Sequence, residues 1–312
     1  MRMPLCGWKR VETGSGKAKA PGATFVLIAL LLAPAAIAQT TLETLYEGGV
    51  FTEGPAAAPD GSIYFSDITA SSKSKYAGHI LRYDPRTRTT TVFRSPSGMA
   101  NGLAFDPQGR LVVAEGADRG GRRVTRTDLK SGRSEVLADR FRDKAFNSPN
   151  DLTTDSKSRV YFTDPRYVGA EPVEQPLMGV YRIDGDGSIH LVVNDAGRPN
   201  GVAISPDDKT LYVASTDDAP HHILAYDLSP EGNATNRRTF VDFGDTGYAD
   251  GLTVDKRGNV YCGCGPLGVR VFDPSGKEIR KIATPAEATN VEVVGDSVYV
   301  TAGGGLYRAR LP

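Results

Sequence analysis

Residues 101–103 read Asn-Gly-Leu, and a step of the same kind returns near residues 150, 200 and 250. The four copies are Asn101-Gly102-Leu103, Asn150-Asp151-Leu152, Asn200-Gly201-Val202 and Asp250-Gly251-Leu252. Glu53-Gly54-Pro55 is a variant ahead of them, and Asn290 follows them. A period of about fifty residues, filled with short strands, is typical of a propeller. Because equivalent positions in a radial array face the same axis, we expect these six side chains to converge there.

Each repeat carries the same series of short predicted strands after the axial position. Ile63-Tyr64-Phe65 follows the turn Pro59-Asp60-Gly61, which is a hairpin signal. The next strand alternates apolar and polar residues and usually ends in Asp, as in residues 180–184. A further strand follows after a short turn, as in residues 89–93. We interpret the terminal Asp residues as turn caps.

The sequence therefore predicts an all-β fold, a six-bladed β-propeller with four antiparallel strands per blade. The last repeat reaches Pro312 without a fourth strand, and residues 41–46 precede the first axial position. We expect these N-terminal residues to complete the last blade, so that the two termini close the ring and leave no long exposed edge. Residues 39–312 would form this single domain. No segment shows a sustained helical period, which disfavours a βαβ fold.

The first 38 residues are interpreted as a secretory signal rather than as part of the fold. Basic residues precede an apolar run over residues 23–32, and Ala36-Ile37-Ala38 offers small residues for cleavage. The run is short for a spanning helix, although an uncleaved anchor is an alternative. We expect a periplasmic or secreted protein, exported by a bacterial Sec-type signal, with no stable membrane association after cleavage.

Composition is that of an ordinary globular protein. The chain has 312 residues, 39% hydrophobic and 24% charged, with equal numbers of acidic and basic residues and a pI near 6.9. This balance gives no reason to expect nucleic acid as a partner. Cys262 and Cys264 flank Gly263 on a predicted strand, and we interpret them as two small buried hydrophobic residues.

The axial residues suit a hard divalent cation. Glu53 and Asp250 contribute carboxylates, whereas Asn150 and Asn200 contribute neutral carbonyls, a mixture that Ca²⁺ accepts. No axial position is His, which argues against a zinc site of the usual kind. His221 and His222, after Asp217-Asp218, are either part of a solvated loop or a ligand or proton shuttle.

The motifs resemble the SMP-30/gluconolactonase/LRE-like family over essentially the whole chain after the signal. They include Phe51-Thr52-Glu53-Gly54-Pro55, Ala100-Asn101-Gly102-Leu103, Asn147-Ser148-Pro149-Asn150-Asp151-Leu152, Tyr161-Phe162-Thr163-Asp164-Pro165, Arg198-Pro199-Asn200-Gly201 and Ala249-Asp250-Gly251-Leu252. The resemblance implies one divalent metal at the axial mouth, with Ca²⁺ favoured and Zn²⁺, Mn²⁺ or Mg²⁺ as alternatives. It implies that Glu53, Asn200 and Asp250 bind the metal. Asn150 then binds the metal or metal-bound substrate, and Asn101 faces the substrate.

One segment departs from the pattern of that family. Many bacterial members that are similar to gluconolactonases carry Glu-His around the second blade. This chain instead reads Glu115-Gly116-Ala117-Asp118 there. Because this change alters a wall of the expected pocket, the identity of a sugar substrate is not carried over.

The resulting hypothesis is a metal-dependent, gluconolactonase-like carboxylic-ester hydrolase that opens a sugar lactone or a related small lactone. Asp250 is the candidate general base, Arg198 a candidate substrate contact, and Asp151 a residue that could orient Asn150. Two alternatives stay open: an organophosphate hydrolase with the same metal ring, and a propeller that binds a ligand without catalysis.

Overall fold

The structure is a computed structural model, which describes residues 41–69, 77–217, 221–245 and 247–311. Gln39–Pro312 forms one compact unit. The described residues form strands and turns and contain no helix, so that no helix in this part of the chain could cross a membrane. The predicted signal, residues 1–38, lies outside the described residues.

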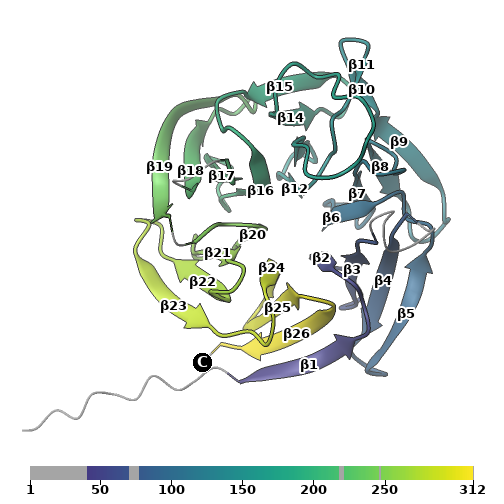
Figure 1. Ribbon diagram of the computed structural model, residues 1–312, viewed down its shortest axis with the longest axis vertical. Helices are drawn as coiled ribbons and strands as arrows, with labels where there is room; N and C mark the ends of the chain where they lie inside the picture. The colour runs from purple at the N-terminus through teal and green to yellow at the C-terminus, as the bar shows by residue number, and fades with distance from the viewer. Residues whose placement is uncertain (1–40, 70–76, 218–220, 246, 312) are drawn as a thin grey trace, which may run out of the picture. The chain divides into compact units, whose positions relative to one another are not determined.

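Six four-stranded antiparallel sheets are arranged around a common centre (Figure 1). The first blade comprises β2 (Thr52–Ala57), β3 (Ile63–Asp67), β4 (His79–Asp84) and β5 (Thr89–Arg94). The second comprises β6 (Ala100–Phe105), β7 (Leu111–Glu115), β8 (Arg123–Thr127) and β9 (Ser134–Ala138). The third comprises β12 (Leu152–Thr154), β13 (Val160–Thr163), β14 (Val180–Ile183) and β15 (Ile189–Val193). A small hairpin of β10 (Arg140–Phe141) and β11 (Lys144–Ala145) lies between the second and third blades in sequence.

The remaining blades follow the same order from the centre outward. The fourth blade comprises β16 (Pro199–Ile204), β17 (Thr210–Ser215), β18 (His221–Leu228) and β19 (Ala234–Gly244). The fifth comprises β20 (Leu252–Val254), β21 (Val260–Gly263), β22 (Val269–Phe272) and β23 (Glu278–Ile282). The sixth comprises β24 (Ala288–Val294), β25 (Ser297–Ala302), β26 (Gly305–Arg310) and β1 (Leu42–Glu47). The six-bladed propeller predicted from the fifty-residue period is confirmed.

The ring closes by joining the two ends of the chain in one sheet. Strand β1 pairs antiparallel with β26, with Leu42 opposite Ala309 and Glu47 opposite Gly305. The N-terminal strand therefore supplies the outermost strand of the last blade, as predicted, and covers the edge that β26 would otherwise expose.

The hydrophobic core lies between adjacent sheets rather than at the axis. Between the second and third blades, Phe146 packs edge-to-face on Phe162 with ring centroids 5.0 Å apart, and Tyr181 stacks on Phe162. Each of these side chains is fully buried, which stabilises the fold by roughly 1.5–3 kcal/mol for an aromatic residue of this size. These rings belong to the third blade and the segment that leads into it, and Val112 and Val124 of the second blade pack in the same cluster.

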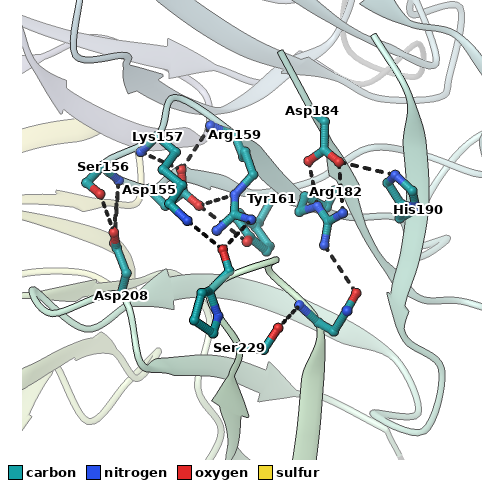
Figure 2. A network of polar contacts seen from close by, with 12 residues as sticks. Asp155, Ser156, Lys157, Arg159, Tyr161, Arg182, Asp184, His190, Asp208 and Ser229 are labelled. Carbon is teal, nitrogen blue, oxygen red and sulfur yellow. Dashed lines mark hydrogen bonds and ion pairs between the residues drawn. The ribbon is translucent and has the colours of Figure 1, made fainter. Parts of the chain in front are cut away.

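Polar turns connect neighbouring blades at the ends of the strands that point away from the axial residues. In Figure 2, Asp155 in the β12–β13 turn accepts one hydrogen bond from the backbone N–H of Arg159 and one from its side chain. The Arg159 side chain also donates to the Pro230 carbonyl at 3.1 Å. Lys157 donates to the same carbonyl at 2.6 Å. These bonds link the third blade to the fourth.

The terminal Asp residues act in part as the sequence predicts. Asp84 and Asp273 cap their turns, because each Oδ1 accepts the backbone N–H two residues later at 2.9 Å. Asp184 instead binds Arg182 through both carboxylate oxygens, as Figure 2 shows.

The two free thiols are also as expected: Cys262 and Cys264 are fully buried, with their Sγ atoms 2.8 Å apart.

Candidate functional site: an acidic cavity at the axis

The axial residues lie at the start of the innermost strand of each blade, where the strands are irregular. Glu53, Asn101 and Asn200 lie in β2, β6 and β16, and Asn150 and Asp250 lie two residues before β12 and β20. The strand register shifts beside each of the first three, between Glu53 and Ala56, Ala100 and Leu103, and Pro199 and Val202. A β-bulge of this kind redirects a side chain, here toward the axis.

Backbone hydrogen bonds hold successive axial residues against one another. The N–H of Gly102 donates to the Asn150 carbonyl at 2.7 Å, and the N–H of Gly201 donates to the Asp250 carbonyl at 3.0 Å. A Cβ atom on Gly201 would lie 2.2 Å from that same carbonyl oxygen. The glycine that follows an axial residue is therefore required by the close approach of neighbouring inner strands.

Five of the six axial side chains line one cavity of about 520 Å³, which we term the mouth cavity. These five are Glu53, Asn101, Asn150, Asn200 and Asp250, and we term them the polar base. The described residues that form the rest of the lining are Val50, Phe51, Ile68, Met99, Gly116, Ala117, Ser148, Pro149, Tyr167, Val168, Thr216, His221 and Tyr248. The structure thus brings together the predicted ligand set and Asn101.

The polar base carries two carboxylates, and the described residues of the lining include no Lys or Arg. Glu53 is 4% exposed, and its burial, together with the charge of Asp250, raises the pKa of its carboxyl well above the usual range. Burial, followed by the charge of Asp151, raises the pKa of Asp250 to about 7. A buried carboxylate and a partly buried one without a basic partner carry an electrostatic cost that a divalent cation would remove.

The donor set fits a hard cation, although it is not rich in charge. Among the described residues, no group of three or more His, Cys, Asp or Glu side chains is arranged to hold a metal. The axial ring instead combines the carboxylates of Glu53 and Asp250 with the amide oxygens of Asn150 and Asn200. Oxygen ligands of both kinds suit Ca²⁺, whose coordination is flexible and usually includes water.

Asp151 and Asn290 face a second cavity, of about 290 Å³, between the innermost strands. We term this cavity the central channel. Asn290 Nδ2 donates to Asp151 Oδ2 at 3.4 Å, and the backbone N–H of Leu152 donates to Asp151 Oδ1 at 2.9 Å. Burial raises the pKa of Asp151 to about 7. The carboxylate of Asp151 therefore lies on the channel side of the ring, with Asn290, rather than in the mouth cavity.

Arg198 is not among the described residues that line the mouth cavity. Its guanidinium lies over the ring of Tyr167, 5.8 Å from the centroid, and Tyr167 itself lines the cavity. Arg198 could therefore act on a ligand through Tyr167. Its Nε atom is buried and has no hydrogen-bond partner in the structure.

Sequence reasoning did not single out Tyr167 or Tyr248. Both come from connections between strands, which carry no periodic signal, and only the folded chain brings them to the axis. His221, at the start of β18, also lines the cavity, and its Nδ1 atom is buried without a partner. The adjacent Tyr248 ring lies 6.4 Å from the His221 ring. His221 therefore lies in a strand and in the cavity wall, and its role as a ligand or proton shuttle stays a prediction.

The Glu115 segment forms part of the cavity wall, as its departure from the family pattern suggested. The buried Glu115 carboxylate accepts bonds from Arg94 at 3.1 Å, Arg123 at 2.7 Å and Thr125 at 2.9 Å. Gly116 and Ala117, which follow it, line the cavity and bring no polar side chain to it.

Two features together define the class to which this protein belongs: the six-bladed propeller fold, and an axial cavity lined by acidic and amide side chains. The family model of the SMP-30/gluconolactonase/LRE-like region matches residues 51–304, and the chain belongs to this family. It is 30% identical over 295 residues to a gluconolactonase of Zymomonas mobilis, covering 87% of this chain and 81% of that protein. It is also 30% identical over 260 residues to a pentonolactonase of Haloferax volcanii, covering 81% of each.

The fold has close counterparts among solved structures. A gluconolactonase from Xanthomonas campestris superposes with a TM-score of 0.77 at 31% sequence identity, covering 88% of this chain and 90% of that one.

Proposed function

We propose that this protein is a metal-dependent hydrolase that opens a lactone, of the sugar-lactone type or a related small lactone. The observation that carries the proposal is the pair of carboxylates at the base of the mouth cavity, the buried Glu53 and the partly buried Asp250. The names of the two relatives above, a gluconolactonase and a pentonolactonase, support the same reaction class.

The residues of the polar base have distinct roles in this proposal. Glu53, Asn150, Asn200 and Asp250 would hold one divalent cation, with Ca²⁺ favoured, and the cation would polarise the lactone carbonyl. Asn101, at the edge of the same base, would orient the substrate. Asp250 would take a proton from the attacking water, because a carboxylate beside the cation can act as a general base.

The test is a lactone panel read by acid release, with EDTA and with Ca²⁺, Mn²⁺ or Zn²⁺ restored. Asp250→Asn should lower kcat by roughly 10²–10⁴-fold, the usual contribution of a positioned general base. Asp207→Asn is a matched control, because Asp207 has a side chain 59% exposed in a surface turn. Full activity of Asp250→Asn in EDTA would overturn both the metal and the base. Hydrolysis of a phosphotriester but of no lactone would favour the organophosphatase alternative.

We also propose that the chain is exported and that its mature form starts near Gln39. The support is the basic, apolar and small-residue pattern of residues 1–38. Edman sequencing of the protein recovered from the periplasm or medium should read from Gln39 or a neighbouring residue. Recovery of an uncleaved chain in the membrane fraction would contradict the proposal.

A further inference from the structure

The wall of the mouth cavity differs in chemistry from its base. Val50, Phe51, Ile68, Met99, Ala117 and Val168 all line the cavity above the acidic and amide residues. Three of them are large apolar side chains left in solvent, because Val50 is 44%, Phe51 40% and Val168 45% exposed. Apolar side chains gathered at the rim of a cavity are characteristic of a ligand site.

Hydrogen bonds fix this wall in place. The backbone N–H groups of Val50 and Phe51 both donate to Asp67 Oδ1, at 2.8 and 3.0 Å. On the other side, the Glu171 carboxylate accepts the backbone N–H of Arg119 at 2.7 Å and of Asp118 at 3.2 Å. These bonds connect the segment after Ala117 to the segment after Val168, so that two parts of the apolar wall are held together.

Three hydroxyl groups of the wall, those of Tyr167, Thr216 and Ser148, already form hydrogen bonds within the protein. The Tyr167 hydroxyl lies 2.5 Å from Thr216 Oγ1, which also donates to the Arg198 carbonyl at 3.2 Å. Ser148 Oγ accepts the backbone N–H of Ala117 at 2.9 Å. Among the described wall residues, His221 Nδ1 is a buried polar atom without a protein partner.

A polyol lactone is a poor match for such a wall. Each ring hydroxyl that enters the cavity leaves water and needs a partner, and an unpaired buried hydroxyl weakens binding. None of the described residues that line the wall is Asp, Glu, Lys or Arg, since the charge of Glu115 is turned toward Arg94 and Arg123. A volume of about 520 Å³ is also of the size that accommodates ligands larger than one small ring.

We infer that the preferred substrate is a lactone with an apolar alkyl or aryl substituent, whose carbonyl meets the polar base while its substituent contacts Phe51 and Val168. This inference rests on the proposed lactone hydrolysis and narrows its substrate class away from polyhydroxylated lactones. The reaction adds one water across the acyl C–O bond of the ring. The water proton passes to the departing ring oxygen, and the product is a hydroxy acid with an apolar tail.

Three lactones with the same six-membered ring test the inference: δ-valerolactone, δ-decalactone and glucono-δ-lactone. We expect kcat/KM for δ-decalactone to exceed that for each of the other two by roughly 10-fold or more, since one methylene in an apolar pocket discriminates by about 10–200-fold. A higher kcat/KM for glucono-δ-lactone than for δ-decalactone would overturn the inference.

Variants of the wall separate its role from general effects on folding. Phe51→Ser and Val168→Ser should each raise the KM for δ-decalactone relative to that for δ-valerolactone by roughly 10-fold. Val92→Ser is the matched control, because Val92 is 60% exposed on β5 and is not among the lining residues. An unchanged KM ratio in both wall variants would contradict the assignment of the wall.

A binding measurement distinguishes failure of this inference from failure of the proposed reaction. Calorimetry would compare 6-pentylpiperidin-2-one with piperidin-2-one, the lactam counterparts of δ-decalactone and δ-valerolactone. If no lactone is hydrolysed but the pentyl lactam binds more tightly, the apolar site stands and the proposed reaction is wrong. Equal affinity for the two lactams would overturn the apolar site.

Discussion

Glu53 lies buried close to Asp250, and both carboxylates belong to a cavity whose described lining contains no Lys or Arg. Burial favours the protonated form of each group, and so do neighbouring charges, that of Asp250 on Glu53 and that of Asp151 on Asp250, so that both pKa values are raised. At the scale of single residues, the axial ring is therefore an unfavourable arrangement unless a cation binds to it. Function and stability are opposed at this point of the molecule.

Replacing Glu53 by Gln should separate the electrostatic cost of this carboxyl group from its contribution to binding a cation. In EDTA at pH 7, Glu53→Gln should be about 1 kcal/mol or more stable than the wild type. The raised pKa of Glu53 means that the folded protein must hold a proton which the unfolded chain releases, and an amide does not carry this cost. Excess Ca²⁺ should raise the Tm of the wild type and leave that of Glu53→Gln nearly unchanged, because only a bound ion stabilises the fold. Thermal unfolding followed by circular dichroism measures both. If Ca²⁺ raised the Tm of the two proteins equally, Glu53 would not be a ligand of the ion.

Glu292, which is not one of the predicted metal ligands, should make the stability of the fold depend on pH. It lines the central channel and accepts a hydrogen bond from Thr253 at 3.3 Å, and burial raises its pKa from 4.5 to about 7. The folded protein therefore binds this proton more tightly than the unfolded chain does. The associated stability is fully present below pH 4.5 and is lost as the pH rises through about 7.

Glu292→Gln should remove this loss, because an amide does not ionise. We expect the variant to be roughly 1–3 kcal/mol more stable than the wild type at pH 8, with a much smaller difference at pH 4.5. Urea unfolding at the two pH values measures the difference. A gap between variant and wild type that does not depend on pH would contradict the assignment.

At the scale of the strand, the inner edge of each blade is shaped by glycine and by β-bulges. Gly201 donates to the Asp250 carbonyl at 3.0 Å, and this contact leaves no room for a side chain. The Gly that follows four of the six axial residues is visible in the sequence as a repeated step. The reason for it, the contact between strands fifty residues apart, is visible only in the fold.

Gly201→Ala should destabilise the protein by about 1–3 kcal/mol, because a methyl group forces the two inner strands apart. Gly185→Ala is the control, since a Cβ atom there would meet nothing within 4 Å. Chemical denaturation of the two variants and the wild type gives the comparison. If Gly201→Ala were as stable as Gly185→Ala, the inner strands would have to be more loosely packed than they are in the structure.

At the scale of the whole molecule, the propeller depends on one pairing between the ends of the chain. Strand β1 completes the last blade through its ladder with β26, reinforced by Glu43, which accepts hydrogen bonds from Arg308 in that blade and from Arg88 in the first. Since each sheet packs on two neighbours, opening one blade exposes the core of two interfaces.

Removal of β1 should therefore weaken the entire ring. A chain that starts at residue 48 should unfold at a lower Tm and with lower cooperativity than one that starts at Gln39, because β26 becomes an unpaired edge. Scanning calorimetry of the two chains measures both quantities. Equal Tm values would show that the ring is closed by packing alone.

Much of this architecture could be predicted from local pattern. The axial step at Asn101, Asn150, Asn200 and Asp250 recurs at nearly constant intervals, and periodicity alone predicted six blades and the closing strand. The polar base of the cavity followed from the same repeat, because equivalent positions in a ring face one axis. Periodicity could not show that Asp151 and Asn290 turn to the central channel, since the β-bulges that set side-chain direction are local and irregular.

The sequence by itself determined the repeat, the number of blades and the residue types at the axis, because these depend on spacing along the chain. The tertiary structure decided which side of the ring each axial side chain faces and what surrounds the acidic base. Phe51, Val168, Tyr167 and His221 come from connections and strand ends that share no period. Their meeting in one wall depends on how the blades pack, and that wall is where the choice of substrate is made.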